Sequence, residues 1–184
     1  MENERKVVLY IAQSLDGYIA RSNGDIDWLD GDGSEPDSDF GYNDFYESID
    51  SVIIGRNTYE QIIEDLSPEQ WPYEGKDTYV VTTDDLEPNE NVKFIKGDVV
   101  NFIKDLKVKE GKDIWIVGGA ILIDSLIKEN IVDEYIISIM PTILGDGIKL
   151  FNENNPEIKL KFNGSSVYNG AVVLHYLKDK VIVG

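Results

Sequence analysis

The chain has 184 residues, 42% of them apolar and 10% aromatic, which is enough for one domain with a sizeable core. Asp and Glu number 35 against 17 Lys and Arg, and the formal net charge of -18 is expected to repel nucleic acid and anionic membrane surfaces. The sequence has no cysteine, which excludes disulfides and thiolate sites. Without a signal peptide or an apolar run of roughly 18 to 20 residues, a cytoplasmic protein is expected.

The first half of the chain alternates between predicted strands and helices. Residues 6–13 (KVVLYIAQ) are apolar on both faces, which is typical of a strand at the centre of a sheet. Residues 14–39 are rich in Gly, Asp and Ser yet include Tyr18 and Trp28, so we expect a long loop that packs on the rest of the domain. The elements expected next are a helix over 40–50, a strand over 51–55, a helix over 57–64 and strands over 78–83 and 92–97.

The second half begins in the same way and then changes. The elements expected here are a helix over 99–106, a strand over 113–119, a helix over 120–128 and strands over 133–141, 158–168 and 171–178. The last two strands are joined through Asn169-Gly170, which is a hairpin signal. We therefore predict a single three-layer α/β domain over residues 1–184, with a mostly parallel central sheet, helices on both of its faces and an antiparallel C-terminal hairpin.

The pair Gly118-Gly119 stands where a buried strand turns into a helix. Ligands of open α/β sheets bind at the carboxyl ends of the strands, and glycine lets a ligand approach the backbone closely. The following helix points its free N–H groups and the positive end of its dipole at the same spot. We interpret the pair as a seat for a pyrophosphate, with close packing of strand and helix as the other reading.

A second strand-to-helix turn, SVIIGRNTYE (51–60), has the same arrangement. Gly55 ends the strand, and Arg56 and Thr58 open the helix with a guanidinium and a hydroxyl that suit a phosphate. Two such turns on one edge of a sheet could hold the two ends of one dinucleotide. An isolated Arg at such a position could also be a solvated surface cation.

The order of three motifs resembles a known superfamily. A strand followed by GRNTYE, a later strand ending in VVTT, and the run IVGGAILI are similar in order to the elements with which the dihydrofolate reductase superfamily binds NADPH. The segments AQSLDGYIA (12–20) and MPTILGDGIKLF (140–151) resemble the riboflavin-biosynthesis reductase branch, the RibD C-terminal domain and its stand-alone relatives. The resemblance covers the chain from about residue 6 to residue 176, and it implies a dihydrofolate reductase-like fold.

The resemblance implies a set of contacts with the cofactor along these turns. Ala12 and Ile19 would flank the nicotinamide. The residues that would hold phosphates are Gly55, Arg56, Asn57 and Thr58, and those that would lie beside the adenosine are Thr82 and Thr83. The segment that would cradle the pyrophosphate consists of Val117, Gly118, Gly119, Ala120, Ile121 and Leu122.

Two departures from the family pattern bear on specificity. Arg56 with Thr83 would favour the 2′-phosphate of NADPH over NADH, but dihydrofolate reductases often place a second basic residue just after the glycines, where this chain has Ala120 and Ile121. Biosynthetic riboflavin reductases normally follow the second strand with an Ala-Asp-Asp-Pro-type segment that grips a ribose phosphate, and this chain has GRNTYE instead. The expected substrate is a pteridine- or pyrimidine-like heterocycle.

The proton relay and the lid are expected in or beside the long loop. By family analogy the acidic residue falls on Asp39, while Asp44 follows on the same predicted helix and Asp16 is the acid of the riboflavin-type opening. These carboxylates remain alternatives, and each could instead be a helix cap or a solvated charge. Trp28 and Tyr18 are the candidates for groups that shield the site, with ordinary loop packing as the other reading.

These expectations describe an NADPH-dependent reductase, resembling 5-amino-6-(5-phosphoribosylamino)uracil reductases or dihydrofolate reductases, that transfers hydride to a small heterocycle. The alternative is a non-catalytic or regulatory nucleotide-binding protein on the same fold. The resemblance also implies a homodimer formed through the C-terminal sheet. No metal site is expected, because the single histidine, His175, lies in a predicted strand and a structural role suits it better.

Overall fold

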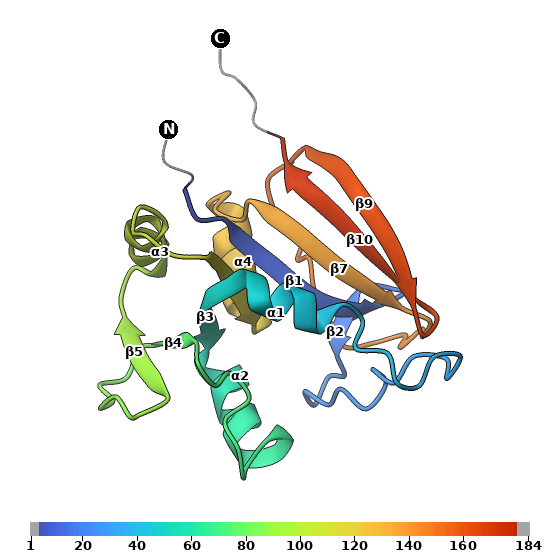
Figure 1. The fold of residues 1–184 in the computed structure, drawn as a ribbon, viewed down its shortest axis with the longest axis horizontal. Coiled ribbons are helices and arrows are strands. Elements are labelled where there is room, and N and C mark those ends of the chain that lie inside the picture. The colour runs from blue at the N-terminus through green and yellow to red at the C-terminus, as the bar shows by residue number, and fades with distance from the viewer. Residues whose placement is uncertain (1–3, 180–184) are drawn as a thin grey trace.

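An eight-stranded sheet forms the centre of the computed structural model, which describes residues 4–179 (Figure 1). The strand order is β5-β4-β3-β6-β1-β7-β10-β9. The strands are β1 (Val7–Ser14), β3 (Ile49–Gly55), β4 (Asp77–Thr82), β5 (Val92–Lys96), β6 (Asp113–Gly118), β7 (Glu134–Met140), β9 (Leu160–Tyr168) and β10 (Ala171–Lys178). A separate pair is formed by two short strands, β2 (Tyr18–Ala20) and β8 (Ile148–Lys149).

The sheet is parallel from β5 to β7 and antiparallel at β10 and β9, which confirms the predicted fold class. β1 pairs in parallel with β6 and β7, and β3 does so with β4 and β6. β10 runs antiparallel to both β7 and β9. The central strands are apolar on both faces because both faces are covered: Val7 and Leu9 pack into one core cluster and Val8 into another.

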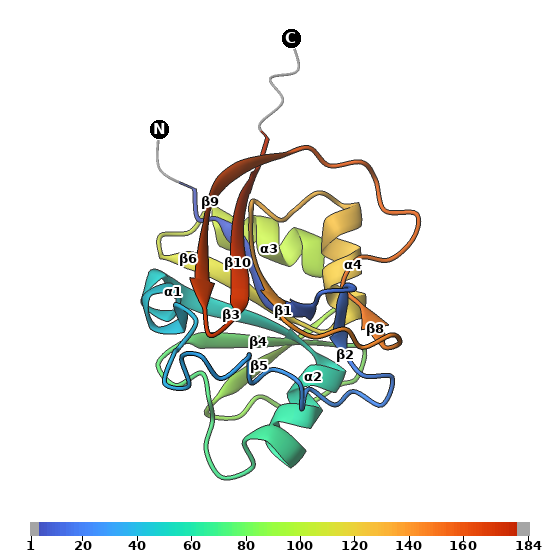
Figure 2. The same cartoon turned by 90° about the vertical axis from the view of Figure 1, so that its right-hand side faces the viewer.

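Helices cover the sheet on both faces, as predicted. They are α1 (Tyr42–Ser48), α2 (Arg56–Gln61), α3 (Val99–Lys107) and α4 (Ala120–Lys128), and a π-helical turn, Ile62–Leu66, continues α2. α3 and α4 share a core with Leu9, whereas α1 and α2 contribute Phe45 and Tyr59 to the core on the opposite face. Figure 2 shows α1 and α4 on opposite sides of the strands. Among residues 4–179, none of the helices has the length and apolarity needed to cross a membrane.

Three details differ from the sequence prediction. The helix predicted over 40–50 ends at Ser48, because Ile49 is fully buried as the first residue of β3. The helix predicted over 57–64 begins at Arg56 and changes to the π-helical turn after Gln61. The loop over 14–39 contains β2, whose three residues are too few for a recognisable pattern and whose partner β8 lies far along the chain.

The long loop docks on the turn of the C-terminal hairpin at Asn169. The buried Asn169 side chain donates from Nδ2 to the Asp30 carbonyl oxygen (2.7 Å) and accepts at Oδ1 from the Glu35 backbone N–H (2.9 Å). Its own carbonyl oxygen accepts from the Asp32 N–H (3.0 Å). The predicted hairpin and the prediction that the loop packs on the domain are both confirmed.

Candidate functional site

Two strand-to-helix turns lie side by side at the carboxyl edge of the sheet, because β3 and β6 are parallel neighbours. β3 ends at Gly55, and β6 ends at Gly118, whose peptide bond to Gly119 is cis and whose φ is 140°. A Cβ added to Gly55 would lie 3.2 Å from the Gly119 amide nitrogen, and one added to Gly119 would lie 2.9 Å from Thr58 Oγ1. Glycine therefore allows the two turns to touch, which confirms the packing reading.

The helices that follow these turns begin without a side-chain cap in the described part of the chain. Gly55 is the N-cap of α2 and Gly119 is the N-cap of α4, and within residues 4–179 neither helix has a side-chain hydrogen bond at its N-cap. Free N–H groups and the positive end of the helix dipole attract anions. This edge of the sheet therefore presents backbone donors that suit phosphate oxygens.

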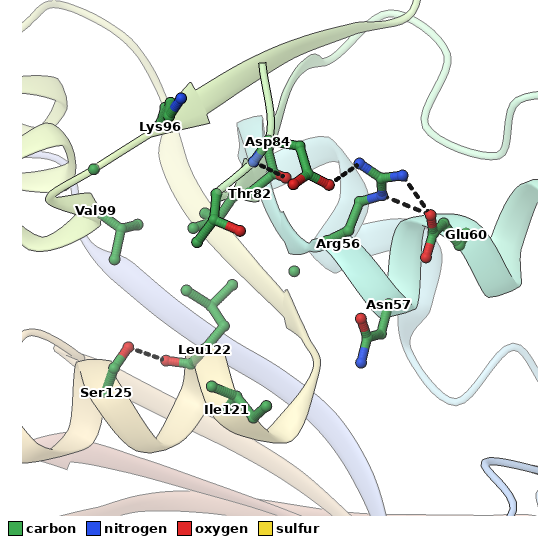
Figure 3. Close-up of a pocket in the computed structure, with 14 residues that line it drawn as sticks. Arg56, Asn57, Glu60, Thr82, Asp84, Lys96, Val99, Ile121, Leu122 and Ser125 are labelled. Carbon is green, nitrogen blue, oxygen red and sulfur yellow. Dashed lines mark hydrogen bonds and ion pairs between the residues drawn. The ribbon is translucent and has the colours of Figure 1, made fainter. Parts of the chain in front are cut away.

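A cavity of about 830 Å³ opens between these turns and the end of β4, and we call it the β4 cleft (Figure 3). It is lined by Gly55, Arg56, Asn57, Glu60, Val81, Thr82, Thr83, Asp84, Lys96, Gly97, Val99, Ile121, Leu122 and Ser125. Val81, Val99 and Leu122 give it apolar walls suited to a flat ring. The Thr82 hydroxyl accepts from the Asp84 N–H (3.1 Å), which orders the chain where β4 ends.

Arg56 lies in the β4 cleft, where two carboxylates already contact its guanidinium (Figure 3). Its Nε donates to Glu60 Oε1 at 2.7 Å, and its Nη1 lies 3.3 Å from Asp84 Oδ2. Lys96, the other cation of the lining, lies 2.6 Å from Asp85. A bound anion would therefore compete with these carboxylates for the two cations, which weakens the gain from each new ion pair.

A second cavity, of about 690 Å³, is lined by residues of β1, β2, the long loop and α2, and we call it the β2 cleft. Its apolar lining includes Ile11, Ala12, Ile19, Ala20, Ile26, Leu29, Ile62, Val117 and Ile148. Its charged lining consists of Asp25, Glu60, Glu64 and Asp65, and no Lys, Arg or His from residues 4–179 joins it. Asn57 and Glu60 line both clefts, so the two cavities meet at the start of α2.

The residues expected to bind a cofactor lie along these two clefts. The β4 cleft is lined by Gly55, Arg56, Asn57, Thr82, Thr83, Ile121 and Leu122. The β2 cleft is lined by Ala12, Ile19, Asn57, Thr58, Val117 and Gly118. Gly119 and Ala120 line neither cavity, but they are the N-cap and the first residue of α4. The structure therefore gathers at one edge residues that stand far apart in the sequence.

The candidate acids on the α1 side lie outside both clefts. Asp39 accepts from the backbone N–H groups of Asn43 (3.1 Å) and Gly41 (3.0 Å), and these hydrogen bonds lower its pKa. Asp44 is exposed in the first turn of α1. A carboxyl group with a lowered pKa is ionised at neutral pH and is poorly suited to donate a proton. Asp39 therefore accepts hydrogen bonds at the start of α1, which agrees with its interpretation as a helix cap.

Asp16 also lies outside both clefts, in the turn between β1 and β2. Its carboxylate accepts from the Ser14 hydroxyl (2.6 Å) and from the Leu144 (3.1 Å) and Gly145 (2.7 Å) backbone N–H groups. The Ser14 hydrogen bond, aided by the two backbone bonds, lowers the pKa of Asp16 to about 2. Asp16 thus ties the β1–β2 turn to the segment before β8.

Trp28 packs inside the protein and lines neither cleft. Its side chain is 7% exposed and lies in a small core with Met140 and Ala171. Its neighbour Leu29 lines the β2 cleft instead. Tyr18 belongs to β2, where it pairs with Lys149 of β8. Ordinary packing is therefore the reading of Trp28 that fits the structure.

Sequence analysis does not identify the carboxylates that do line the β2 cleft. Glu60 and Glu64 are spaced four residues apart in the predicted helix, and Asp65 follows directly. That spacing is equally typical of a solvated helix face, so it carries little information by itself. Asp25 comes from the long loop, and only the packing of that loop brings it to the same cavity.

The strand order, the helices on both faces and the two clefts at the carboxyl edge define a dihydrofolate reductase-like α/β protein. A comparison with protein families narrows this class: the model of the RibD C-terminal domain matches residues 5–174. The chain therefore belongs to the RibD C-terminal domain family, and the resemblance seen in the sequence is confirmed.

Individual relatives agree with this assignment. The chain is 47% identical over 176 residues to the uncharacterized protein YwjB of Bacillus subtilis (strain 168), and the match covers 95% of this chain and 99% of YwjB. The structure of a candidate riboflavin biosynthesis protein from Shewanella sp. PV-4 matches with a TM-score of 0.81 and 31% identity, covering 95% and 99% of the two chains. A dihydrofolate reductase from Enterococcus faecalis complexed with NADP(H) has a TM-score of 0.62 at 18% identity, covers 95% and 97%, and shows the likeness of fold.

Proposed function

We propose that the protein is an NADPH-dependent reductase that transfers hydride to a small pteridine- or pyrimidine-like heterocycle. The observation that carries the proposal is the junction of the two clefts at the start of α2, where Asn57 lines both. One cleft offers cations and backbone N–H groups, and the other offers an apolar chamber. Membership of the RibD C-terminal domain family supports a reductase on this fold.

The residues present fit a nicotinamide dinucleotide. The α4 start and Gly119 offer uncapped N–H groups to a pyrophosphate, and the walls of the β4 cleft suit an adenine ring. Arg56 and Lys96 lie at the same end, where the 2′-phosphate that distinguishes NADPH from NADH would compete with their carboxylate partners. A dinucleotide that enters the β4 cleft with its adenosine would direct its nicotinamide to the junction with the β2 cleft.

Bound NADPH would supply the hydride, so the chain itself has to bind the cofactor and the acceptor, orient them and exclude water from between them. In our proposal Ala12 and Ile19, which line the β2 cleft, contact the nicotinamide and exclude water from its face. Asn57 and Thr58 hold the central phosphates from the start of α2. The apolar floor of the β2 cleft keeps the acceptor ring flat against the cofactor.

The cofactor site is tested by titrating the purified protein with NADPH and with NADH while tryptophan fluorescence is followed. We expect NADPH to bind more tightly, and Arg56→Ala to weaken NADPH binding by about tenfold while NADH binding changes little. Arg21→Ala is the matched control, because Arg21 pairs with Asp27 (2.6 Å) and lines neither cleft. Binding of neither nucleotide would refute the proposal.

Turnover separates the reductase from the alternative, a non-catalytic nucleotide-binding protein. Oxidation of NADPH is followed by the loss of absorbance of its reduced nicotinamide. Dihydrofolate and riboflavin-pathway pyrimidines are supplied as acceptors. Oxidation that depends on both the protein and the acceptor supports the reductase. Tight NADPH binding without turnover of any acceptor in this series favours the alternative.

A further inference from the structure

The β2 cleft combines an apolar floor with a rim of carboxylates, and this combination restricts the charge of its ligand. The floor comes from β1, β2 and β6, through residues such as Ile11 and Val117. The rim comes from the long loop and the α2 segment, through Asp25, Glu64 and Asp65. Because apolar and acidic residues line the same cavity, a single ligand in the cleft would face both.

The rim carboxylates form no direct ion pair with a cation of residues 4–179, although Asp25 adds to the larger effect of Asp27 in raising the pKa of Arg21. No ion pair joins Asp25, Glu64 or Asp65 to a basic side chain in that range. Arg21, the cation closest to Asp25 in sequence, is engaged with Asp27. The rim therefore adds carboxylates without direct ion-pair partners in that range to a chain whose formal net charge is already -18.

The two clefts differ in their cations. Arg56 and Lys96 both line the β4 cleft, whereas no described Lys, Arg or His lines the β2 cleft. Phosphate groups are bound in proteins by guanidinium or ammonium groups and by free backbone N–H groups. Asn57 at the start of α2 lines both clefts, but the β4 cleft adds two cations, whereas the described charged groups of the β2 cleft are all carboxylates. The β2 cleft is therefore the less favourable of the two for a phosphate.

We infer that the β2 cleft takes a heterocycle that carries no phosphate and is either uncharged or protonated. Amino groups of this heterocycle would donate hydrogen bonds to the rim carboxylates. The inference rests on the proposed function, because it assigns the β2 cleft to the hydride acceptor. It adds that the acceptor is not a sugar phosphate conjugate such as 5-amino-6-(5-phosphoribosylamino)uracil, and that its dephosphorylated form or a free amino-substituted ring fits better.

Equilibrium binding of a matched pair of ligands tests this inference. The pair is 5-amino-6-(5-phosphoribosylamino)uracil and the same compound without its phosphate, each titrated into the full chain by calorimetry without cofactor. We expect the dephosphorylated compound to bind about tenfold more tightly at low salt, and the preference to shrink when NaCl is raised from about 20 mM to about 300 mM. An equal or opposite preference would overturn the inference, and so would binding of neither compound.

Two charge-reversal variants locate the effect. Glu64→Lys should reduce the preference by several fold, because it replaces a rim carboxylate with an ammonium group. Glu69→Lys changes the net charge of the protein equally, but Glu69 is exposed and does not line the cleft, so the preference should stay as in the wild type. Equal effects of the two variants would assign the preference to net charge and overturn the role of the rim.

This experiment is independent of the cofactor test. If NADPH does not bind, the proposed reductase fails while the charge preference of the β2 cleft is still measured. If NADPH binds and the phosphorylated compound is the better ligand, the reductase stands and the inference about its substrate fails.

Discussion

Arg56 brings a guanidinium to the β4 cleft, and this guanidinium forms ion pairs with Glu60 and Asp84. The side chain of Arg56 is 29% exposed and that of Asp84 is 64% exposed, so the pair of Arg56 with Asp84 is weak and open to competition. The consequence for specificity is that the net attraction for a 2′-phosphate depends on these acids as much as on the arginine. If the protein binds NADPH as proposed, a single carboxylate would adjust its preference for NADPH over NADH.

Replacing Asp84 with Asn should increase the affinity for NADPH by about threefold, because one negative charge beside the proposed 2′-phosphate position is removed. NADH has no such phosphate, so its affinity should change by less. The dissociation constants of both nucleotides, measured by fluorescence titration, check this. Glu87→Gln, in the same loop but outside the cleft lining, is the control. An equal gain for both nucleotides would contradict the assignment.

At the scale of elements, the docking of the long loop on the hairpin turn shapes the β2 cleft. The loop contributes Asp25 and Leu29 to the cleft, yet its anchor is the buried side chain of Asn169 at the far end of the chain. Gly31 and Gly170 lie at the same contact, where added Cβ atoms would meet Asn169 and Asp32. The shape of the cleft therefore depends on the C-terminal hairpin.

The Asn169→Ala variant should destabilise this contact. The substitution leaves the Asp30 carbonyl and the Glu35 N–H without their partner, and a typical hydrogen bond contributes about 0.5 to 1.5 kcal/mol. We expect faster amide hydrogen exchange over residues 25–39 and weaker substrate binding, with β1 and β6 unchanged. Asn163→Ala, at an exposed position of the neighbouring strand, is the control. Unchanged exchange in the loop would refute the anchoring role.

Asp16 joins two elements in a way that depends on pH. Its pKa is lowered from 3.8 to about 2 in the folded protein, chiefly by the Ser14 hydroxyl. The contribution of Asp16 to stability is therefore complete above the pKa that it has in the unfolded chain, and it is lost as the pH falls from about 4 toward 2. Asp16→Ala should therefore lower the melting temperature by a few degrees at pH 7. The difference from the wild type should vanish near pH 2. Melting curves followed by circular dichroism across this range check it, and a difference independent of pH would contradict it.

At the scale of the whole molecule, β9 and β10 leave an apolar face uncovered. Figure 1 shows these strands at the end of the sheet away from α2, α3 and α4. Val167 and Val172 are cross-strand partners that are 65% and 38% exposed, and Phe162 on β9 is 57% exposed. Exposed apolar patches of this kind mark protein–protein interfaces. We propose that a second copy of the chain covers this face in a homodimer.

Light scattering after size-exclusion chromatography tests the homodimer. We expect the mass of two chains for the wild type and of one chain for the double variant Phe162→Asp and Val167→Asp, because buried carboxylates without partners are costly. Lys161→Glu, on the adjacent exposed position of β9, should leave the dimer intact. A wild type with the mass of a single chain would refute the proposal.

Elements set by local sequence patterns are predictable, whereas boundaries set by long-range packing are not. Buried apolar runs such as residues 7–9 predict central parallel strands, because a strand covered on both faces must be apolar on both. Gly55 and Gly118 mark strand-to-helix turns for a similarly local reason. Boundaries such as the end of α1 at Ser48 depend instead on which side chain the core buries, and the sequence pattern continues past that point.

The sequence by itself indicated the alternation of the main strands and helices and the edge at which the candidate cofactor residues lie, because these depend on local apolar patterning and on glycines at strand ends. The family was indicated by the resemblance of three motifs in their order. The tertiary structure alone decided that Asp84 pairs with Arg56, that Trp28 packs inward, and that Asp25 and Glu64 line one cavity to which residues 4–179 contribute no cation. These contacts join residues far apart in the chain, and side-chain electrostatics act through space and leave no periodic signal in the sequence.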